Sequence, residues 1–81
     1  MTTIIRRLGI APSKRDALCS ACNNCPDVFE LDSGDFAIIG FDVTIEMTGI
    51  LPSDAGCGEG EKIVRIPREV LIAASKDLER A

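Results

Sequence analysis

Two apolar runs separated by a short polar turn form the clearest pattern in the chain. Residues 28–31 and 36–41 are mostly apolar, and the polar residues 32–35 between them include Gly34. Apolar runs on either side of a polar turn that contains glycine are typical of a β-hairpin. The pattern therefore predicts two antiparallel strands joined by residues 32–35.

The C-terminal part of the chain changes from strand to helix periodicity. Residues 61–66 predict a strand, and Pro67 suits the first position of a helix, where its missing N–H leaves no hydrogen bond unmade. Four apolar residues after it are spaced as one helical face and predict a buried stripe: Val70, Leu71, Ala74 and Leu78. The residues expected to face water are Arg68, Lys76, Asp77 and Arg80.

Residues 42–51 fit two patterns. Apolar residues alternate with polar ones from 37 to 47, as in a strand, but another apolar set fits one helical face: Val43, Met47, Ile50 and Leu51. A strand of about twelve residues is long for so small a domain. We therefore favour a helical turn after Thr44, followed by a loop over residues 52–60.

The N-terminal segment is expected to be helical. Thr3 can cap a short helix that ends at Gly9 and carries three apolar residues on one side, Ile4, Ile5 and Leu8. Ser13 and Asp16 have the spacing of a capping box and predict a further helical turn before the first cysteine.

These elements predict one α+β domain over residues 1–81. Its parts are a basic N-terminal arm over 1–18, which leads into a cysteine-rich metal loop, and a core over 19–81. The core is expected to hold the hairpin, extended to a three-stranded antiparallel sheet, and the C-terminal helix. Small domains often depend on a metal or a partner for stability. The 81 residues are 46% hydrophobic with only three phenylalanines, so the core must be aliphatic.

The charge distribution narrows the classes of partner. Residues 1–15 hold four basic side chains and no acidic one, whereas residues 16–81 hold five basic and thirteen acidic ones. Because phosphate contacts dominate DNA affinity, this acidic body argues against direct nucleic-acid binding. No apolar run approaches the roughly 20 residues that span a bilayer. We expect a cytoplasmic protein without a membrane segment.

Four cysteines form the candidate chemical site. Cys19, Cys22 and Cys25 follow the spacing C-x2-C-x2-C and precede Pro26, and Cys57 lies far downstream. A two-residue spacer lets successive thiolates curl around one point. The glycines at 56 and 58 would let the backbone beside Cys57 approach a metal without Cβ clashes. The four cysteines are therefore predicted to hold one metal centre.

The identity of the centre stays open at this stage. Four thiolates complete a structural zinc site, which we favour, but they complete a [4Fe–4S] cluster equally well. The third alternative is four cysteines without a metal, buried or paired as disulfides, including a reversible disulfide between Cys22 and Cys25. A reducing cytoplasm and the clustering of three thiols argue against that alternative.

Two resemblances bear on this choice. The stretch from Cys19 to Asp32, with the cysteine run followed by Pro-Asp-Val-Phe-Glu-Leu-Asp, resembles single-cluster bacterial ferredoxins and implies electron transfer. Most of the chain also resembles small uncharacterised proteins of actinobacteria and their phages. That likeness includes Cys25-Pro26, Glu30-Leu31, residues 34–40 and residues 61–68. It implies a free-standing small module.

The absence of histidine limits catalysis. A chain without histidine has no Ser-His-Asp or Cys-His pair and no His-Glu-x-x-His zinc site. Four cysteine ligands also leave zinc no open position for a water molecule. The sequence therefore predicts a non-enzymatic metal-binding module with a regulatory or accessory role and an unidentified protein partner. The alternative is an iron–sulfur electron carrier or redox sensor.

Overall fold

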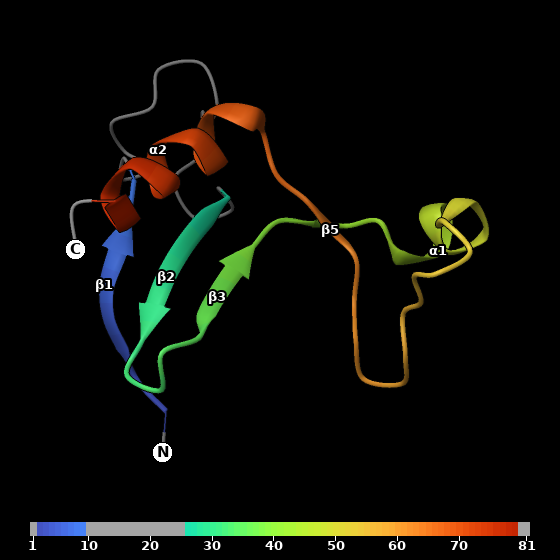
Figure 1. The fold of residues 1–81 in the computed structure, drawn as a ribbon, viewed down its shortest axis with the longest axis horizontal. Coiled ribbons are helices and arrows are strands. Elements are labelled where there is room, and N and C mark those ends of the chain that lie inside the picture. The colour runs from blue at the N-terminus through green and yellow to red at the C-terminus, as the bar shows by residue number, and fades with distance from the viewer. Residues whose placement is uncertain (1, 10–25, 80–81) are drawn as a thin grey trace.

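The computed structural model describes residues 2–9 and 26–79 as an α+β fold (Figure 1). Three strands form an antiparallel sheet in the order β1-β2-β3, with β1 at Ile4–Leu8, β2 at Asp27–Leu31 and β3 at Phe36–Ile39. Two short strands, β4 (Phe41–Asp42) and β5 (Val64–Arg65), pair separately. The helices are α1 (Thr44–Met47), the 3₁₀ helix η3 (Thr48–Ile50) and α2 (Arg68–Glu79).

The predicted hairpin is confirmed as β2 and β3. Its turn is a three-residue loop in which the Leu31 N–H donates to the Asp35 carbonyl at 2.9 Å and the Gly34 N–H donates to the Leu31 carbonyl at 3.1 Å. Gly34 has a φ of 92°, the left-handed conformation that ends such a turn and that glycine adopts without steric cost. The turn therefore fixes the register of the two strands.

The expected N-terminal helix is wrong, because residues 4–8 form strand β1. This strand pairs antiparallel with β2 and joins the sheet, although the sequence placed it in a basic arm outside the core. Arg6 Nε lies 2.6 Å from Glu30 Oε1, and Arg7 Nε lies 2.9 Å from Asp27 Oδ2. A helix this short is unstable alone, whereas the strand gains a ladder and two ion pairs. The residues that decide the outcome lie 20 or more positions away.

The third strand of the sheet is thus β1 and not the segment 61–66. Only Val64 and Arg65 of that segment are in strand conformation, and they pair with Asp42 and Phe41. The helical turn expected after Thr44 is confirmed as α1. Gly40 lies where the chain passes from β3 to β4, and a Cβ there would lie 2.7 Å from the Arg65 carbonyl oxygen. The crossing therefore requires glycine.

The core lies between α2 and the first two strands of the sheet. Leu8, Val28, Val70 and Ala74 form one buried cluster, and Ile66 packs against it. Two positions of the predicted stripe differ from expectation, because Leu71 is 57% exposed and Leu78 is 40% exposed. Asp77 also differs, because it accepts a hydrogen bond from the Gly9 N–H at 2.6 Å. The helix α2 thus contributes Val70 and Ala74 to the buried cluster, and Leu71 and Leu78 lie outside it.

Much apolar surface stays in contact with water. Twelve large apolar side chains are at least 40% exposed, on β1, β3, β4, α1, η3, β5 and α2. Within residues 2–9 and 26–79, no helix is long and apolar enough to cross a membrane.

The first prediction concerns the core. Leu8 is 1% exposed, so Leu8→Ala should lower the free energy of unfolding by about 2–5 kcal/mol. Ile5→Ala, at a neighbouring position that is 58% exposed, is the control and should change it by about 0.5 kcal/mol or less. Urea titration followed by circular dichroism measures both. Equal losses in the two variants would contradict the assignment of β1 to the core.

Candidate metal centre

The structure places one of the four predicted ligands. Cys57 is a half-buried free thiol in the loop between η3 and β5, whereas Cys19, Cys22 and Cys25 lie outside the described residues. Within the described ranges, no group of three or more Cys, Asp or Glu side chains is placed to hold a metal ion. The four-cysteine centre therefore stays a prediction. The structure describes only the two segments that would carry it, the start of β2 after Cys25 and the base of the loop that contains Cys57, and we call these its attachment points.

The first attachment point is the start of β2. Pro26 follows Cys25 directly and is buried, and the next residue, Asp27, is 3% exposed. Both Asp27 carboxylate oxygens accept hydrogen bonds from Arg7 Nε, at 3.1 and 2.9 Å. A buried carboxylate is stable only when it is paired in this way. The chain that leaves the cysteine run is thus anchored firmly to the sheet.

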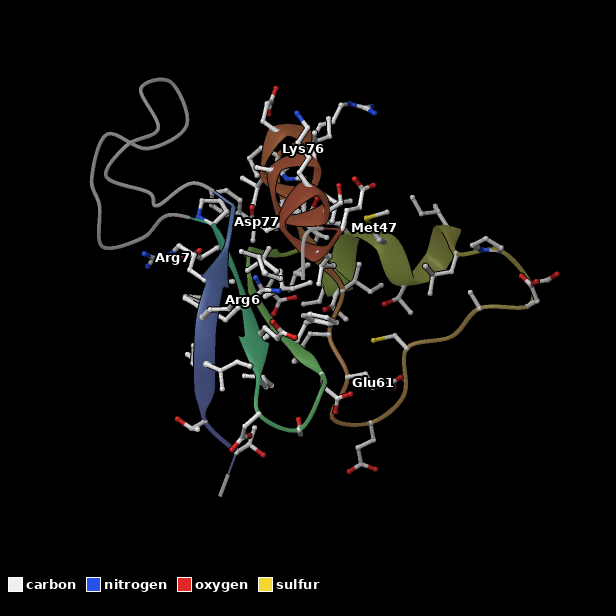
Figure 2. All side chains as sticks on the ribbon, turned by 60° about the vertical axis from the view of Figure 1, so that its left-hand side comes forward. Arg6, Arg7, Met47, Glu61, Lys76 and Asp77 are labelled. Carbon is white, nitrogen blue, oxygen red and sulfur yellow. The ribbon has the colours of Figure 1, made fainter. Side chains whose placement is uncertain are left out.

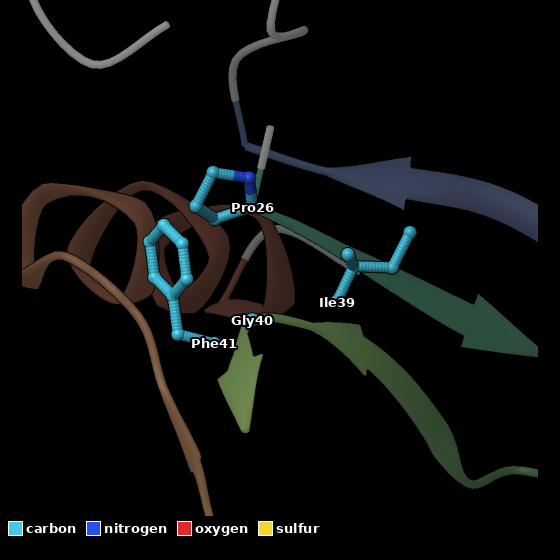
Figure 3. Close-up of a pocket in the computed structure, with 4 residues that line it drawn as sticks. All are labelled: Pro26, Ile39, Gly40 and Phe41. Atoms are coloured by element: carbon cyan, nitrogen blue, oxygen red, sulfur yellow. The ribbon is translucent and has the colours of Figure 1, made fainter. Parts of the chain in front are cut away.

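A small apolar pocket of about 50 Å³ lies beside this anchor (Figure 3). It is lined by Pro26, Ile39, Gly40 and Phe41, so it joins the start of β2 to the passage between β3 and β4. The guanidinium of Arg65 lies 5.3 Å from the centre of the Phe41 ring, on the paired strand β5. The pocket is small and apolar, and it provides no metal ligand of its own.

The second attachment point is the base of the Cys57 loop. The Val43 N–H donates to the Ile63 carbonyl at 2.9 Å, and the Ile63 N–H donates to Thr44 Oγ1 at 2.8 Å. Thr44 Oγ1 also donates to Asp42 Oδ1 at 2.7 Å. One hydroxyl therefore ties the end of the loop to the start of α1. Sequence reasoning missed this role of Thr44, although an aspartate two residues before a threonine is a common turn pattern.

Two turns shape the loop around Cys57. The Ala55 N–H donates to the Pro52 carbonyl at 3.0 Å, and the Glu61 N–H donates to the Gly58 carbonyl at 3.0 Å. Glu61, labelled in Figure 2, also accepts a hydrogen bond from the Gly58 N–H at its Oε1, at 2.7 Å. The thiol lies in an open hollow lined by Leu51, Ala55, Gly56, Cys57, Glu61, Lys62 and Ile63.

The glycine before Cys57 is not required by the described chain. Gly56 does not have a positive φ, and a Cβ built on it would meet nothing within 4 Å. A Cβ on Gly58 would lie 3.3 Å from Glu61 Oε1. Neither backbone conformation nor packing thus accounts for glycine at 56.

No family model matches the chain, and neither a curated protein nor a solved structure matches it. The resemblances to single-cluster ferredoxins and to small actinobacterial proteins accordingly stay predictions. The candidate centre rests on the residues of this chain alone.

The second prediction concerns the base of the Cys57 loop. The hydrogen bond from the Thr44 hydroxyl, followed by the one from the Thr44 N–H, lowers the pKa of Asp42 below its ordinary value of 3.8. Thr44→Val removes the hydroxyl donor, so the pKa of Asp42 should rise toward 3.8. Titration of the Asp42 carboxyl carbon by NMR measures the change. Thr48→Val is the control, because its hydroxyl donates to the Thr44 carbonyl and not to Asp42.

The lowered pKa of Asp42 also predicts how the free energy of unfolding changes at acidic pH. A carboxyl whose pKa is lower in the folded state stabilises the fold above its unfolded pKa, and this stabilisation is lost as the pH falls through the folded pKa. Below about pH 4 the wild type should therefore lose stability more steeply than Thr44→Val. An Asp42 pKa that is equal in the wild type and in Thr44→Val would contradict the role of the hydroxyl.

Proposed function

We propose that this chain is a small metal-binding module in which Cys19, Cys22, Cys25 and Cys57 hold one structural zinc ion. The module acts by binding a protein partner, in a regulatory or accessory role, and carries out no catalytic step. The observation that carries the proposal is the C-x2-C-x2-C run together with the one remaining cysteine of the chain. Four thiolates fill the tetrahedral sphere of zinc and leave no position for a substrate.

The small core supports a stabilising metal. Among the described residues only five hydrophobic side chains are buried: Leu8, Val28, Val43, Val70 and Ala74. Zinc binding in small peptides provides apparent free energies of about 10–16 kcal/mol, whereas whole domains are stable by about 5–15 kcal/mol. A metal held by four cysteines would join the segment before β2 to the loop before β5. It would thereby fasten the Cys57 loop, which lies outside the buried cluster, to the sheet.

The surroundings of Cys57 support its role as the distant ligand. The thiol is free and half-buried, the loop is held at its base by Thr44, and the position of Gly56 leaves space next to it. A ligand that lies far along the chain must be presented by a segment with a defined position, because metal affinity depends on ligand geometry. The loop has a defined position at its base, where Thr44 holds it, and the thiol of Cys57 faces an open hollow.

A [4Fe–4S] cluster on the same four cysteines is the second candidate. The triple two-residue spacing is the one that bacterial ferredoxins use, whereas zinc sites more often use separate pairs of cysteines. In that case the module would carry electrons or sense oxidants. A cluster absorbs visible light and zinc does not, so the two candidates differ in an observable that needs no assay of function.

The third prediction is the metal content of the protein. We expect one zinc and no visible absorption when the chain is purified anaerobically from cells grown with both iron and zinc. About four irons with matching sulfide would assign the iron–sulfur alternative. Protein without metal under these conditions would overturn both candidates.

The fourth prediction tests the role of Cys57 in the centre. Cys57→Ser should abolish stoichiometric metal binding and the cooperative thermal transition seen by circular dichroism, since metal binding and folding are coupled in small domains. Ser53→Ala, at an exposed position in the same loop, should leave both unchanged. An unaltered melting curve after chelation of the wild type would contradict the structural role of the metal.

Glycine substitutions test the geometry of the same site without removing a ligand. Gly56→Ala adds a Cβ that meets nothing in the described chain, so the metal-loaded protein should keep the wild-type circular dichroism spectrum, while metal affinity falls about 10- to 100-fold. Gly49→Ala is the matched control, because its Cβ also meets nothing within 4 Å and Gly49 is not among the residues that line the hollow of Cys57. Competition with a chromogenic chelator measures both affinities. Equal affinities would contradict close approach at Gly56.

A further inference from the structure

The two edges of the three-stranded sheet differ in their protection against pairing. At one edge, β1 carries Arg6 and Arg7 and has a register irregularity between Ile4 and Arg6. Charges and bulges are the usual means by which proteins prevent edge-to-edge pairing. At the other edge, β3 consists of Phe36, Ala37, Ile38 and Ile39, with no charge and no irregularity. Only the β1 edge is protected.

The hydrogen-bonding groups at the β3 edge are available. The Leu31 N–H bonds to the Asp35 carbonyl, so the alternation of an antiparallel ladder makes Ala37 and Ile39 the next residues bonded to β2. The N–H and C=O groups of Phe36 and Ile38 therefore point away from β2. No other strand of the described chain pairs with this edge.

Side-chain burial decreases across the sheet toward the same edge. Leu8, Val28 and Ile38 are cross-strand neighbours in one row, and their exposures are 1%, 5% and 44%. The reason is the position of α2, which packs on β1 and β2 (Figure 1). Phe36, on the same face as Ile38, is 45% exposed. The apolar face of β3 thus lies beyond the cover of the helix.

We propose that β3 pairs antiparallel with β3 of a second copy of this chain, which joins the two sheets into one of six strands. This inference goes beyond the proposed function, since the metal takes no part in the pairing of the two strands. A two-fold axis at Ala37 places Phe36 opposite Ile38 of the second copy. Both residues have outward N–H and C=O groups, so they exchange backbone hydrogen bonds on each side of the axis. Two large apolar side chains then face each other in each pair.

The charges around the strand favour this occupant. In that register Asp35 lies opposite Ile39 of the second copy, so no like charges are directly opposed. Self-pairing through β1 would instead bring the arginines of two copies together, which is destabilising. The strand also offers exposed apolar side chains to the contact, since Phe36, Ile38 and Ile39 are 45%, 44% and 53% exposed.

Sedimentation equilibrium of the full, metal-loaded chain in reducing buffer tests the proposal. We expect the wild type to have twice the 8.7 kDa chain mass. Ile38→Lys should weaken the dimer at least about 100-fold, because each interface carries the substitution twice. Ile5→Lys, at a position that is 58% exposed on the protected edge, is the matched control and should remain dimeric. Circular dichroism verifies that each variant is folded.

A charge exchange at Ala37 tests the register independently of Ile38. Ala37→Lys and Ala37→Asp should each be monomeric alone, because like charges meet at the axis, and should form a heterodimer when mixed. Two results would overturn the proposal: a wild type that is monomeric at all concentrations, or an Ile38→Lys variant as dimeric as the wild type. If Ile38→Lys does not fold, the mixture of Ala37→Lys with Ala37→Asp replaces it as the test, and the absence of a heterodimer in that mixture overturns the proposal.

Discussion

The pairing of β1 with β2 is the interaction on which the rest of the structure depends. It brings residues 4–8 beside residues 27–31, so that Leu8 reaches the buried cluster under α2. The same register gives the buried Asp27 its partner, Arg7, whose guanidinium also lies 5.5 Å from the centre of the Phe29 ring. Without β1 the core would lose its most buried side chain, and a carboxylate would remain buried without this arginine. Both losses are costly in a domain of this size.

The exposure of apolar side chains is uneven along the described fold. One helix of twelve residues packs on two strands, and the second ladder, β4–β5, extends away from them with α1 (Figure 1). The buried cluster is correspondingly small, and large apolar side chains such as Ile45 and Ile50 stay exposed at 96% and 72%. Proteins of this kind gain stability from additional links. The proposed metal and the proposed second copy act at different places, one on the Cys57 loop and one on the open edge of the sheet.

The sequence predicted those elements that are determined by neighbouring residues. The β2–β3 hairpin depends on two local apolar runs and on Gly34 in the turn between them. The turn of helix after Thr44 and the C-terminal helix depend on local apolar periodicity. The strand β1 and the pairing of Val64–Arg65 with β4 depend on residues 20 or more positions away, and a local pattern contains no information about them. The exposure of Leu71 has the same origin, since it follows from where the sheet lies. The ligand set of the candidate centre stays a prediction, and the sequence did not indicate that Thr44 would hold the loop of Cys57.

The close contact at Gly40 connects the packing of two parts of the fold. The Arg65 carbonyl oxygen occupies the space that any side chain at this position would need, and a Cβ there would also lie 2.8 Å from Ile66 Cγ2. The backbone is therefore tightly packed where the chain passes from the three-stranded sheet to the β4–β5 ladder. The strand β5 leads directly into Ile66, which packs against the buried cluster, and then into α2. A side chain at position 40 would therefore disturb the pairing of β4 with β5 and the packing of Ile66 against the core at the same time.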